Sequence, residues 1–254
     1  MGNFEGKVCI LTGGAGSLGL ESARLMLAEG AKVMLVDNNK QLLETTVGEL
    51  GGDPKCVATT LADVSDTAQT KNYVAQTVAK FGKIDVLFSN AGISGVIKPV
   101  TEFPEEIFDA VMAVNVRASF LACKYVLPEM NDGGSIILTS SVVGVTADPG
   151  ICAYATSKHA LIGLTRVVAK EVAPRNIRVN AICPGPIDNS FQDNVEVGLT
   201  EVMGTDATAV LDAATPLGRH AKAQEIAQMV FFLASEQSSY STGSVFMADG
   251  GMGI

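Results

Sequence analysis

The chain has 254 residues, of which 47% are hydrophobic and 18% charged, and its formal net charge is −9. This length suits one α/β domain or two small ones, with a core that needs neither disulfides nor a structural metal. The acidic balance argues against nucleic acid or an anionic membrane surface as the main partner. Five cysteines without a C-x-x-C pair indicate free thiols, and two histidines argue against a His-rich metal site.

The sequence starts with MGNFEGK, which lacks the apolar region of a signal peptide. No uninterrupted apolar run reaches the roughly 18 residues that a membrane span needs. We therefore expect a cytoplasmic protein that works without nucleic acid, membrane or metal.

Short apolar runs rich in β-branched residues alternate with helical patterns along the chain. The expected strands span residues 8–11, 32–36, 55–60, 86–89, 135–139, 178–182 and 244–247. The expected helices span residues 21–29, 39–50, 67–81, 105–129, 153–172 and 224–233. Strands of near-continuous Val, Ile and Leu between helices indicate a parallel sheet covered on both faces. With right-handed crossovers, the prediction is an α/β fold with a doubly wound, Rossmann-like sheet.

No linker, repeat or low-complexity tract divides the chain, so we expect a single domain over residues 1–254. One long irregular stretch remains at about residues 184–216. Irregular segments of that length in compact domains are usually lids or binding loops. The prediction is a substrate lid at about residues 186–216.

A glycine-rich segment, ILTGGAGSLG, follows the first strand and opens the first helix, which is the context of a nucleotide-phosphate turn. Two registers fit it. Gly14, Gly16 and Gly19 match G-x-G-x-x-G literally. Counted from Thr12, the segment also nearly matches T-G-x-x-x-G-x-G, with Ser17 at the place of the middle glycine. A glycine-rich turn that binds nothing is the plain alternative.

Asp37 ends the second strand, 18 residues after Gly19, and is followed by Asn38 and Asn39. A carboxylate at this position accepts hydrogen bonds from an adenosine ribose and repels a 2′-phosphate. The first basic residue after it is Lys40. The pattern favours NAD over NADP, and the alternative is a solvated turn aspartate.

Tyr154 and Lys158 lie four residues apart in YATSK, inside a predicted helix, so their side chains share one face. Because a neighbouring ammonium favours the phenolate, we expect Lys158 to lower the pKa of Tyr154 from its usual value of about 10. Ser141 lies 13 residues upstream of the tyrosine. A lone Y-x-x-x-K pattern is common by chance, but the serine and the glycine-rich turn together favour a catalytic set.

These pieces, in this order and at these distances, resemble the classical short-chain dehydrogenase/reductase family over essentially the whole chain. The matching segments are Thr12–Gly19, Asp37, Asp63-Val64, Asn90-Ala91-Gly92, Asn115, Ser140-Ser141, Tyr154 with Lys158, Pro184-Gly185 and the C-terminal ADGG.

The resemblance selects the second register and implies a site for NAD along the sheet. The residues implied to contact the diphosphate are Gly13, Ser17, Leu18 and Gly19. Those implied to contact the adenosine are Asp37, Asn38, Asp63, Val64, Asn90, Ala91 and Gly92. Those implied to contact the nicotinamide side are Tyr154, Lys158, Pro184, Gly185, Ile187 and Asn189. The chain departs from the family pattern at two of these positions. Ser17 replaces the usual glycine, and Asn189 replaces a frequent threonine.

The resemblance also implies hydride transfer between nicotinamide and a carbinol carbon, with Tyr154 as general base for oxidation and general acid for reduction. Ser141 would bond the substrate oxygen and Lys158 would grip the nicotinamide ribose. The backbone carbonyl of Asn115 would anchor a water beside the lysine. The plain alternatives are a polar helix residue for Asn115 and a strand end for Ser140 and Ser141.

No lysine or arginine lies between Lys124 and Lys158, or between Arg178 and Arg219. The expected lid instead carries Asp188, Asp193, Glu196, Glu201, Asp206 and Asp212. These surroundings predict a small neutral alcohol or ketone as the substrate, although Lys98 after the NAG turn opposes this.

Two other functions stay open. One is a 3-oxoacyl-carrier-protein-type reductase of the same family, which needs basic residues at the entrance and usually an NADP site. The other is a non-catalytic dinucleotide-binding scaffold. The helical patterns at residues 105–129 and 153–172 are apolar on more than one face, and the family resemblance suggests a homotetramer built partly from them.

Overall fold

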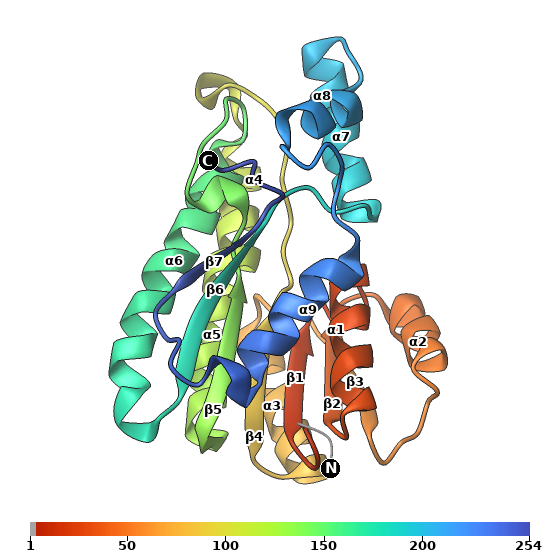
Figure 1. The fold of residues 1–254 in the computed structure, drawn as a ribbon, viewed down its shortest axis with the longest axis vertical. Coiled ribbons are helices and arrows are strands. Elements are labelled where there is room, and N and C mark those ends of the chain that lie inside the picture. The colour runs from red at the N-terminus through yellow and green to blue at the C-terminus, as the bar shows by residue number, and fades with distance from the viewer. Residues whose placement is uncertain (1–3) are drawn as a thin grey trace.

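The structure is a computed structural model that describes residues 4–254. In this range the strands form one parallel sheet of seven, in the order β3-β2-β1-β4-β5-β6-β7 (Figure 1). The strands are β1 (Val8–Thr12), β2 (Lys32–Asp37), β3 (Val57–Leu61), β4 (Ile84–Ser89), β5 (Met130–Thr139), β6 (Arg178–Pro184) and β7 (Val245–Ala248). The strand order reverses between β1 and β4, and in such sheets ligands bind at the carboxyl ends of the strands beside that point. The predicted doubly wound parallel sheet is confirmed.

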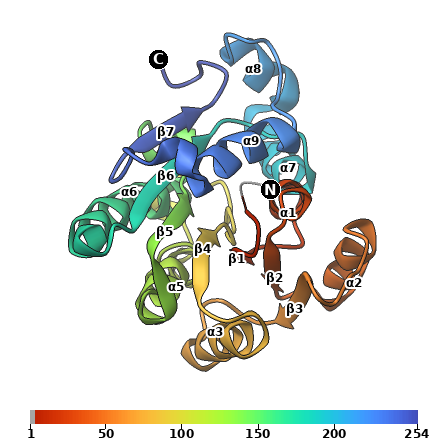
Figure 2. The same ribbon diagram turned by 60° about the horizontal axis from the view of Figure 1, so that its bottom comes forward.

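Helices cover both faces of the sheet, as Figure 2 shows. They are α1 (Ser17–Ala28), α2 (Lys40–Glu49), α3 (Thr67–Phe81), α4 (Glu105–Val111), α5 (Ala118–Val126), α6 (Cys152–Val172), α7 (Ser190–Met203), α8 (Ala207–Ala214) and α9 (Ala223–Ala234). One face carries α3, α5 and α6, and the other carries α1, α2 and α9. Apart from the pattern at residues 105–129, each expected helix and strand exists in its predicted type, with ends that differ by at most a few residues.

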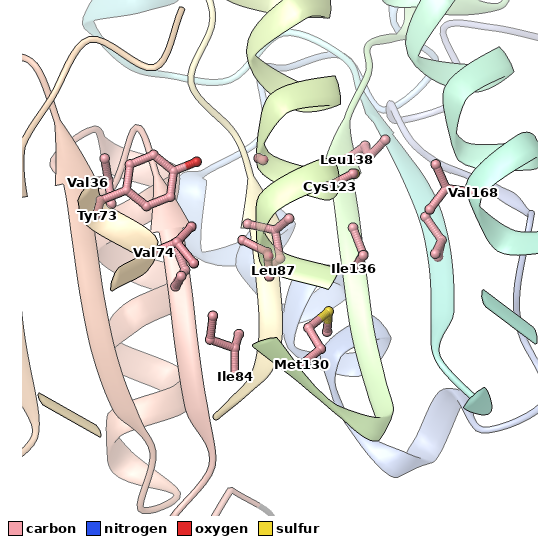
Figure 3. Close-up of a cluster of buried hydrophobic side chains, with 14 of the residues drawn as sticks. Val36, Tyr73, Val74, Ile84, Leu87, Cys123, Met130, Ile136, Leu138 and Val168 are labelled. Carbon is pink, nitrogen blue, oxygen red and sulfur yellow. The ribbon is translucent and has the colours of Figure 1, made fainter. Parts of the chain in front are cut away.

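The strands are apolar without alternation because the sheet is buried on both sides. Every residue of β1 and of β4 is buried. Figure 3 shows one of the two large cores, in which Val36 of β2, Tyr73 of α3, Leu87 of β4, Ile136 of β5 and Val168 of α6 face the same interior. The second large core lies on the opposite face of the sheet, under α1 and α9.

The pattern at residues 105–129 does not form one helix. A π-helical segment, Met112–Arg117, separates α4 from α5, and Asn115 inside it is buried. The extra residue of a π-bulge rotates the chain locally and is frequent at functional sites. By length and composition, Glu105–Glu129 could cross a membrane. Within the fold, however, Leu121 and Ala122 of α5 are buried, so we interpret it as a core helix.

The stretch at residues 184–216 is not irregular, contrary to the prediction. It contains α7 and α8, which stand above the carboxyl ends of the strands at the top of Figure 1. Asn189 and Asp206 cap their N-termini, and α7 ends at Gly204, whose φ is +68°. The apolar pattern here was too weak to reveal the helices because few of their residues are buried.

Candidate active site

The turn between β1 and α1 is tightly packed at the two glycines of the second register. Gly13 has φ of +62°, and a Cβ at this position would lie 3.0 Å from the backbone of Ala91. A Cβ at Gly19 would overlap the carbonyl oxygen of Gly13. No side chain caps the first turn of α1, which begins at Ser17 and continues with Leu18. Its amide groups are therefore suited to hold a phosphate.

Asp37, at the carboxyl end of β2, is connected to this turn. Its Oδ2 accepts a hydrogen bond from the N–H of Ala15 at 3.2 Å, and its Oδ1 accepts one from Asn39 at 3.1 Å. Asn38 between them is exposed. The carboxylate is thus held beside the phosphate turn, on the neighbouring strand.

Asp63 and Val64 follow β3, the next strand outward. Asp63 Oδ1 accepts hydrogen bonds from the N–H and the hydroxyl of Ser65, at 2.9 and 2.7 Å, and Val64 is buried. The strand order places these two residues, Asp37 and the glycine-rich turn along one edge of the sheet. That arrangement fits the extended adenosine half of a dinucleotide.

The Asn90-Ala91-Gly92 turn after β4 is bound to the turn after β1. The N–H groups of Asn90 and Ala91 donate to Thr12 Oγ1 at 3.0 and 3.3 Å, and Asn90 Nδ2 donates to the Gly13 carbonyl at 3.3 Å. Asn90 Oδ1 accepts from the hydroxyl of Thr139 on β5 at 3.2 Å. No role was predicted for these two threonine hydroxyls, although both threonines lie in or beside motifs that the sequence shows.

Asn115 joins the same loop to helix α6. Its Nδ2 donates to the Ile93 carbonyl at 3.0 Å and to Ser157 Oγ at 2.9 Å, while its Oδ1 accepts from the Ile93 N–H. Its backbone carbonyl accepts from the hydroxyl of Ser119 at 3.0 Å. Ser157 is a further residue that the sequence analysis missed, and its position inside YATSK was the available signal.

Tyr154, Lys158 and Ser141 meet at the carboxyl ends of β5 and β6. The Lys158 Nζ lies 5.3 Å from the centroid of the Tyr154 ring and donates to the Thr139 carbonyl at 2.8 Å. Ser141 lies close enough to the phenol to lower its pKa. Ser140 is directed elsewhere, since its hydroxyl donates to the Lys158 carbonyl at 2.8 Å.

The pKa of Tyr154 is raised rather than lowered, which corrects the sequence-based expectation. Burial raises it to about 12, while the hydrogen bond from Ser141 acts in the opposite direction. The Lys158 ammonium donates to the Thr139 carbonyl, and among residues 4–254 no hydrogen bond joins it to the phenol. Burial also lowers the pKa of Lys158 to about 8. In the chain alone, the phenol is therefore a proton donor at neutral pH.

The segment after β6 closes the other side of the site. The Gly185 N–H donates to the Ala248 carbonyl, and Ile187 forms a parallel bridge with Ala221, so the segment that starts at Pro184 is fixed to the C-terminal strand and to the start of α9. Asn189 caps α7 and also reaches Ser17.

Phe191, the second residue of α7, lies beside Tyr154. Its ring centroid lies 6.2 Å from that of Tyr154. The sequence pattern offered no signal for this residue because the segment had no recognised periodicity. Its ring places an apolar group next to the phenol.

The structure thus separates the predicted site residues into two connected groups. Asp37 and Asp63 lie with the phosphate turn on the β1–β3 side, and Ser141, Tyr154 and Lys158 lie on the β5–β6 side. The Asn90 turn joins the two groups. An uncapped helix start, a carboxylate at the end of β2 and a tyrosine–lysine pair together fit a nicotinamide dinucleotide.

Known proteins of the same kind match the chain over nearly its whole length. A family model described as enoyl-(acyl carrier protein) reductase matches residues 13–253. The chain is 42% identical to a 3-oxoacyl-[acyl-carrier-protein] reductase of Thermotoga maritima over 253 residues, covering 99% of both chains. It is 39% identical to levodione reductase of Leifsonia aquatica over 253 residues, covering 98% of this chain and 94% of the relative.

Solved structures also resemble this chain over nearly its whole length. A crystal structure of levodione reductase superposes with a TM-score of 0.94 at 38% identity, covering 98% of each chain. A blue fluorescent protein from a metagenomic library, solved in complex with NADPH, superposes with a TM-score of 0.90 at 32% identity, covering 99% of this chain and 100% of the other.

Proposed function

We propose a function on the basis that this chain belongs to the classical short-chain dehydrogenase/reductase family, whose members are oxidoreductases that bind a nicotinamide dinucleotide. The chain interconverts a small neutral secondary alcohol and its ketone, with NAD(H) as the cofactor. The observation that carries the proposal is the meeting of Ser141, Tyr154 and Lys158 in one site, with the Lys158 ammonium 5.3 Å from the centroid of the Tyr154 ring.

The roles of the three residues follow from their chemistry. The cofactor supplies or accepts the hydride, so the chain must move one proton and orient one oxygen. Tyr154 donates a proton to the ketone oxygen in reduction and accepts it in oxidation. Ser141 hydrogen-bonds the same oxygen, and Lys158 places a positive charge beside a phenol that burial otherwise keeps protonated. Asn115 positions α6 through Ser157, and we assign its carbonyl the role of a water anchor.

The preference for NAD over NADP rests on Asp37. Its carboxylate is held at the carboxyl end of β2 by two backbone N–H groups. A fixed negative charge there repels a 2′-phosphate and accepts bonds from a ribose. One structural neighbour was solved with NADPH, so cofactor choice differs within the family and has to be measured.

A neutral substrate is supported by the residues around Tyr154 and in the lid segment. Phe191 lies against Tyr154, and no lysine or arginine occurs between Arg178 and Arg219. Two lid acids are engaged elsewhere, because Glu196 and Asp212 bind His220. Levodione reductase, a relative and a structural neighbour, is named for a dione, which is consistent with a neutral cyclic ketone here.

A second candidate is a reductase of acyl-carrier-protein thioesters. It is favoured by the 42% identity to a 3-oxoacyl-[acyl-carrier-protein] reductase and by the description of the matching family model. It is opposed by the acidic lid, since an acidic carrier protein binds best to a basic entrance.

We further propose that residues 1–254 form one catalytic domain in which α7 and α8, within residues 186–216, act as the substrate lid. The active form is a homotetramer in the cytoplasm. Exposed Phe120 on α5 and Val167 on α6 support the assembly, because large apolar residues on two neighbouring helices favour burial against other subunits.

The decisive experiment compares the parent with Tyr154→Phe on a panel of cyclic ketones, cyclic alcohols, matched keto acids and a 3-oxoacyl carrier protein, each with NAD(H) and NADP(H). We expect neutral cyclic substrates with NAD(H) to be turned over. Tyr154→Phe should lower turnover by at least about a hundredfold, the usual contribution of general acid–base catalysis, and leave NADH affinity nearly unchanged.

Other outcomes point to other functions. A strong preference for the carrier-protein thioester would favour the second candidate. NADH binding without turnover of any substrate would favour a non-catalytic scaffold. Turnover by Tyr154→Phe within tenfold of the parent would remove the tyrosine from its role.

A further inference from the structure

The two positions at which the chain departs from its family pattern are bonded to each other. Asn189 Nδ2 donates a hydrogen bond to Ser17 Oγ at 3.1 Å, across 172 residues of sequence. Ser17 opens α1 in the phosphate turn, and Asn189 caps α7. The bond therefore joins the cofactor-binding turn directly to the N-cap residue of the lid segment's first helix.

Both the oxygen and the nitrogen of the Asn189 side-chain amide form hydrogen bonds. Its Oδ1 accepts from the N–H of Gln192 at 2.9 Å, which is the cap of α7, and its Nδ2 is the group that reaches Ser17. Because one planar amide makes both bonds, the start of α7 cannot shift relative to the turn without losing one of them. A threonine at this position could cap the helix, but its shorter side chain has no amide donor for the second bond.

The Ser17 hydroxyl is left with a proton to donate. It accepts from Asn189, and no acceptor for its own proton is found among residues 4–254. The hydroxyl stands at the uncapped N-terminus of α1, where an anionic oxygen is favoured. A hydroxyl that donates to an anion becomes a better acceptor for its other partner, since linked hydrogen bonds polarise one another.

We propose that Ser17 and Asn189 form a latch that couples binding of the dinucleotide diphosphate to the seating of lid helix α7. The latch depends on the proposed function in one respect, which is that the chain binds a nicotinamide dinucleotide. Ser17 donates to a diphosphate oxygen and accepts from Asn189, so an occupied turn holds α7 more tightly than an empty one. By reciprocity, a seated α7 binds the dinucleotide more tightly. Both residues are positioning residues.

The test is a double-mutant cycle with Ser17→Ala and Asn189→Ser. Ser17→Ala removes the hydroxyl and leaves the α7 cap intact, whereas Asn189→Ser keeps a good capping residue and removes the amide donor. NADH affinity is measured from the fluorescence of the reduced nicotinamide, which no tryptophan obscures because the chain has none. Hydrogen exchange of residues 190–203, with and without NADH, reports the seating of α7.

We expect each single variant to weaken NADH binding by about threefold to tenfold, the size of one net hydrogen bond. The double variant should be no weaker than either single one, because the two changes remove the same contact. In all three variants, NADH should no longer slow the exchange of residues 190–203. Ser190→Ala, an exposed neighbour on α7, is the matched control and should behave like the parent.

Additive losses of affinity in the cycle would overturn the latch. Unchanged NADH-dependent protection of α7 in Ser17→Ala would also overturn it. If the parent itself binds no NADH or NADPH, the proposed function fails, which is distinct from failure of the latch.

Discussion

The protonation state of Tyr154 is determined by two opposing influences at one hydroxyl. Burial raises its pKa to about 12, and the hydrogen bond from Ser141 moves the pKa in the other direction. Lys158, whose own pKa burial lowers to about 8, is bonded to Thr139 rather than to the phenol. Among these groups, Ser141 is the one whose hydrogen bond with the phenol favours its ionisation.

Replacing Ser141 by alanine should therefore move the pH dependence of oxidation. Oxidation needs the phenolate, so its rate rises with pH through the pKa of Tyr154. Loss of the hydrogen bond raises that pKa, so the rise should occur at higher pH in Ser141→Ala. The measurement is the pH profile of kcat with saturating alcohol and NAD. A rise at the same or lower pH would show that Ser141 does not tune the phenol.

Asp37 is the residue at which cofactor preference should be altered with little structural cost. Asp37→Asn keeps an oxygen acceptor for one backbone N–H and removes the negative charge. We expect the ratio of kcat/KM for NAD to that for NADP to fall by at least about tenfold, or about 1.4 kcal/mol, through better use of NADP. An unchanged ratio would place the discrimination elsewhere.

At the scale of elements, one histidine joins the two helices of the lid segment. His220, just before α9, is hydrogen-bonded through Nε2 to Glu196 of α7 at 2.6 Å and through Nδ1 to Asp212 of α8 at 2.7 Å. Thr208 and Gln192 also donate to Glu196. No role was predicted for His220, and in the fold it joins α7 and α8 to the segment just before α9.

The charge of His220 is favoured on balance. Burial opposes the imidazolium, but the hydrogen bonds and charges of Asp212 and Glu196 outweigh it, so the pKa of His220 is raised above its ordinary value. Only the imidazolium can donate from both ring nitrogens at once. The lid contact therefore depends on protonation.

The attachment of the lid helices should weaken as pH rises. Because the pKa of His220 is raised in the folded state, the stabilisation by its charged form is complete below the unfolded-state pKa of about 6.5. This stabilisation is lost as pH rises through the folded-state pKa. Amide exchange of α7 and α8, corrected for its intrinsic pH dependence, should be slowest at the acidic end of this window and accelerate severalfold above it.

His220→Gln should make this exchange fast at every pH, because glutamine cannot carry the charge. His159→Gln changes the other histidine of the chain, which lies exposed on α6, and serves as the control. If the parent shows no acceleration between acidic and alkaline pH, His220 is not the group that holds the lid.

In the molecule as a whole, the neighbouring helices α5 and α6 each expose a large apolar side chain. Phe120 on α5 is 47% exposed and Val167 on α6 is 55% exposed, although both helices also pack against the core. A helix with apolar residues on two faces needs two partners. The proposed tetramer supplies the second one.

Val167→Lys should dissociate the tetramer, because burial of an unpaired ammonium in an interface is strongly unfavourable. Sedimentation velocity of the parent and the variant measures this directly. Leu42→Lys, on exposed α2 of the opposite layer, is the control and should leave the assembly intact. A parent that sediments as a monomer would contradict the proposed assembly, and a tetrameric Val167→Lys would exclude this surface from the interface.

The sequence by itself determined the features that depend on local pattern. Runs of β-branched residues between amphipathic segments were enough to predict the parallel sheet, since a strand buried on both faces must be apolar throughout. Thr67–Phe81 was predicted with both ends correct, and in the structure Asp66 caps its start and Gly82 follows its last residue. The spacing of Tyr154 and Lys158 fixed their common face on one helix.

The tertiary structure decided what depends on contacts between distant segments. Burial, which no local pattern measures, raised the pKa of Tyr154 where the neighbouring lysine alone would have lowered it. The packing of distant elements places Asn189 against Ser17 and His220 against two lid helices. Asn115 lies in a π-helical segment that the local pattern did not predict. Local sequence specifies which element a residue occupies, whereas the packing of elements specifies its neighbours and hence its chemistry.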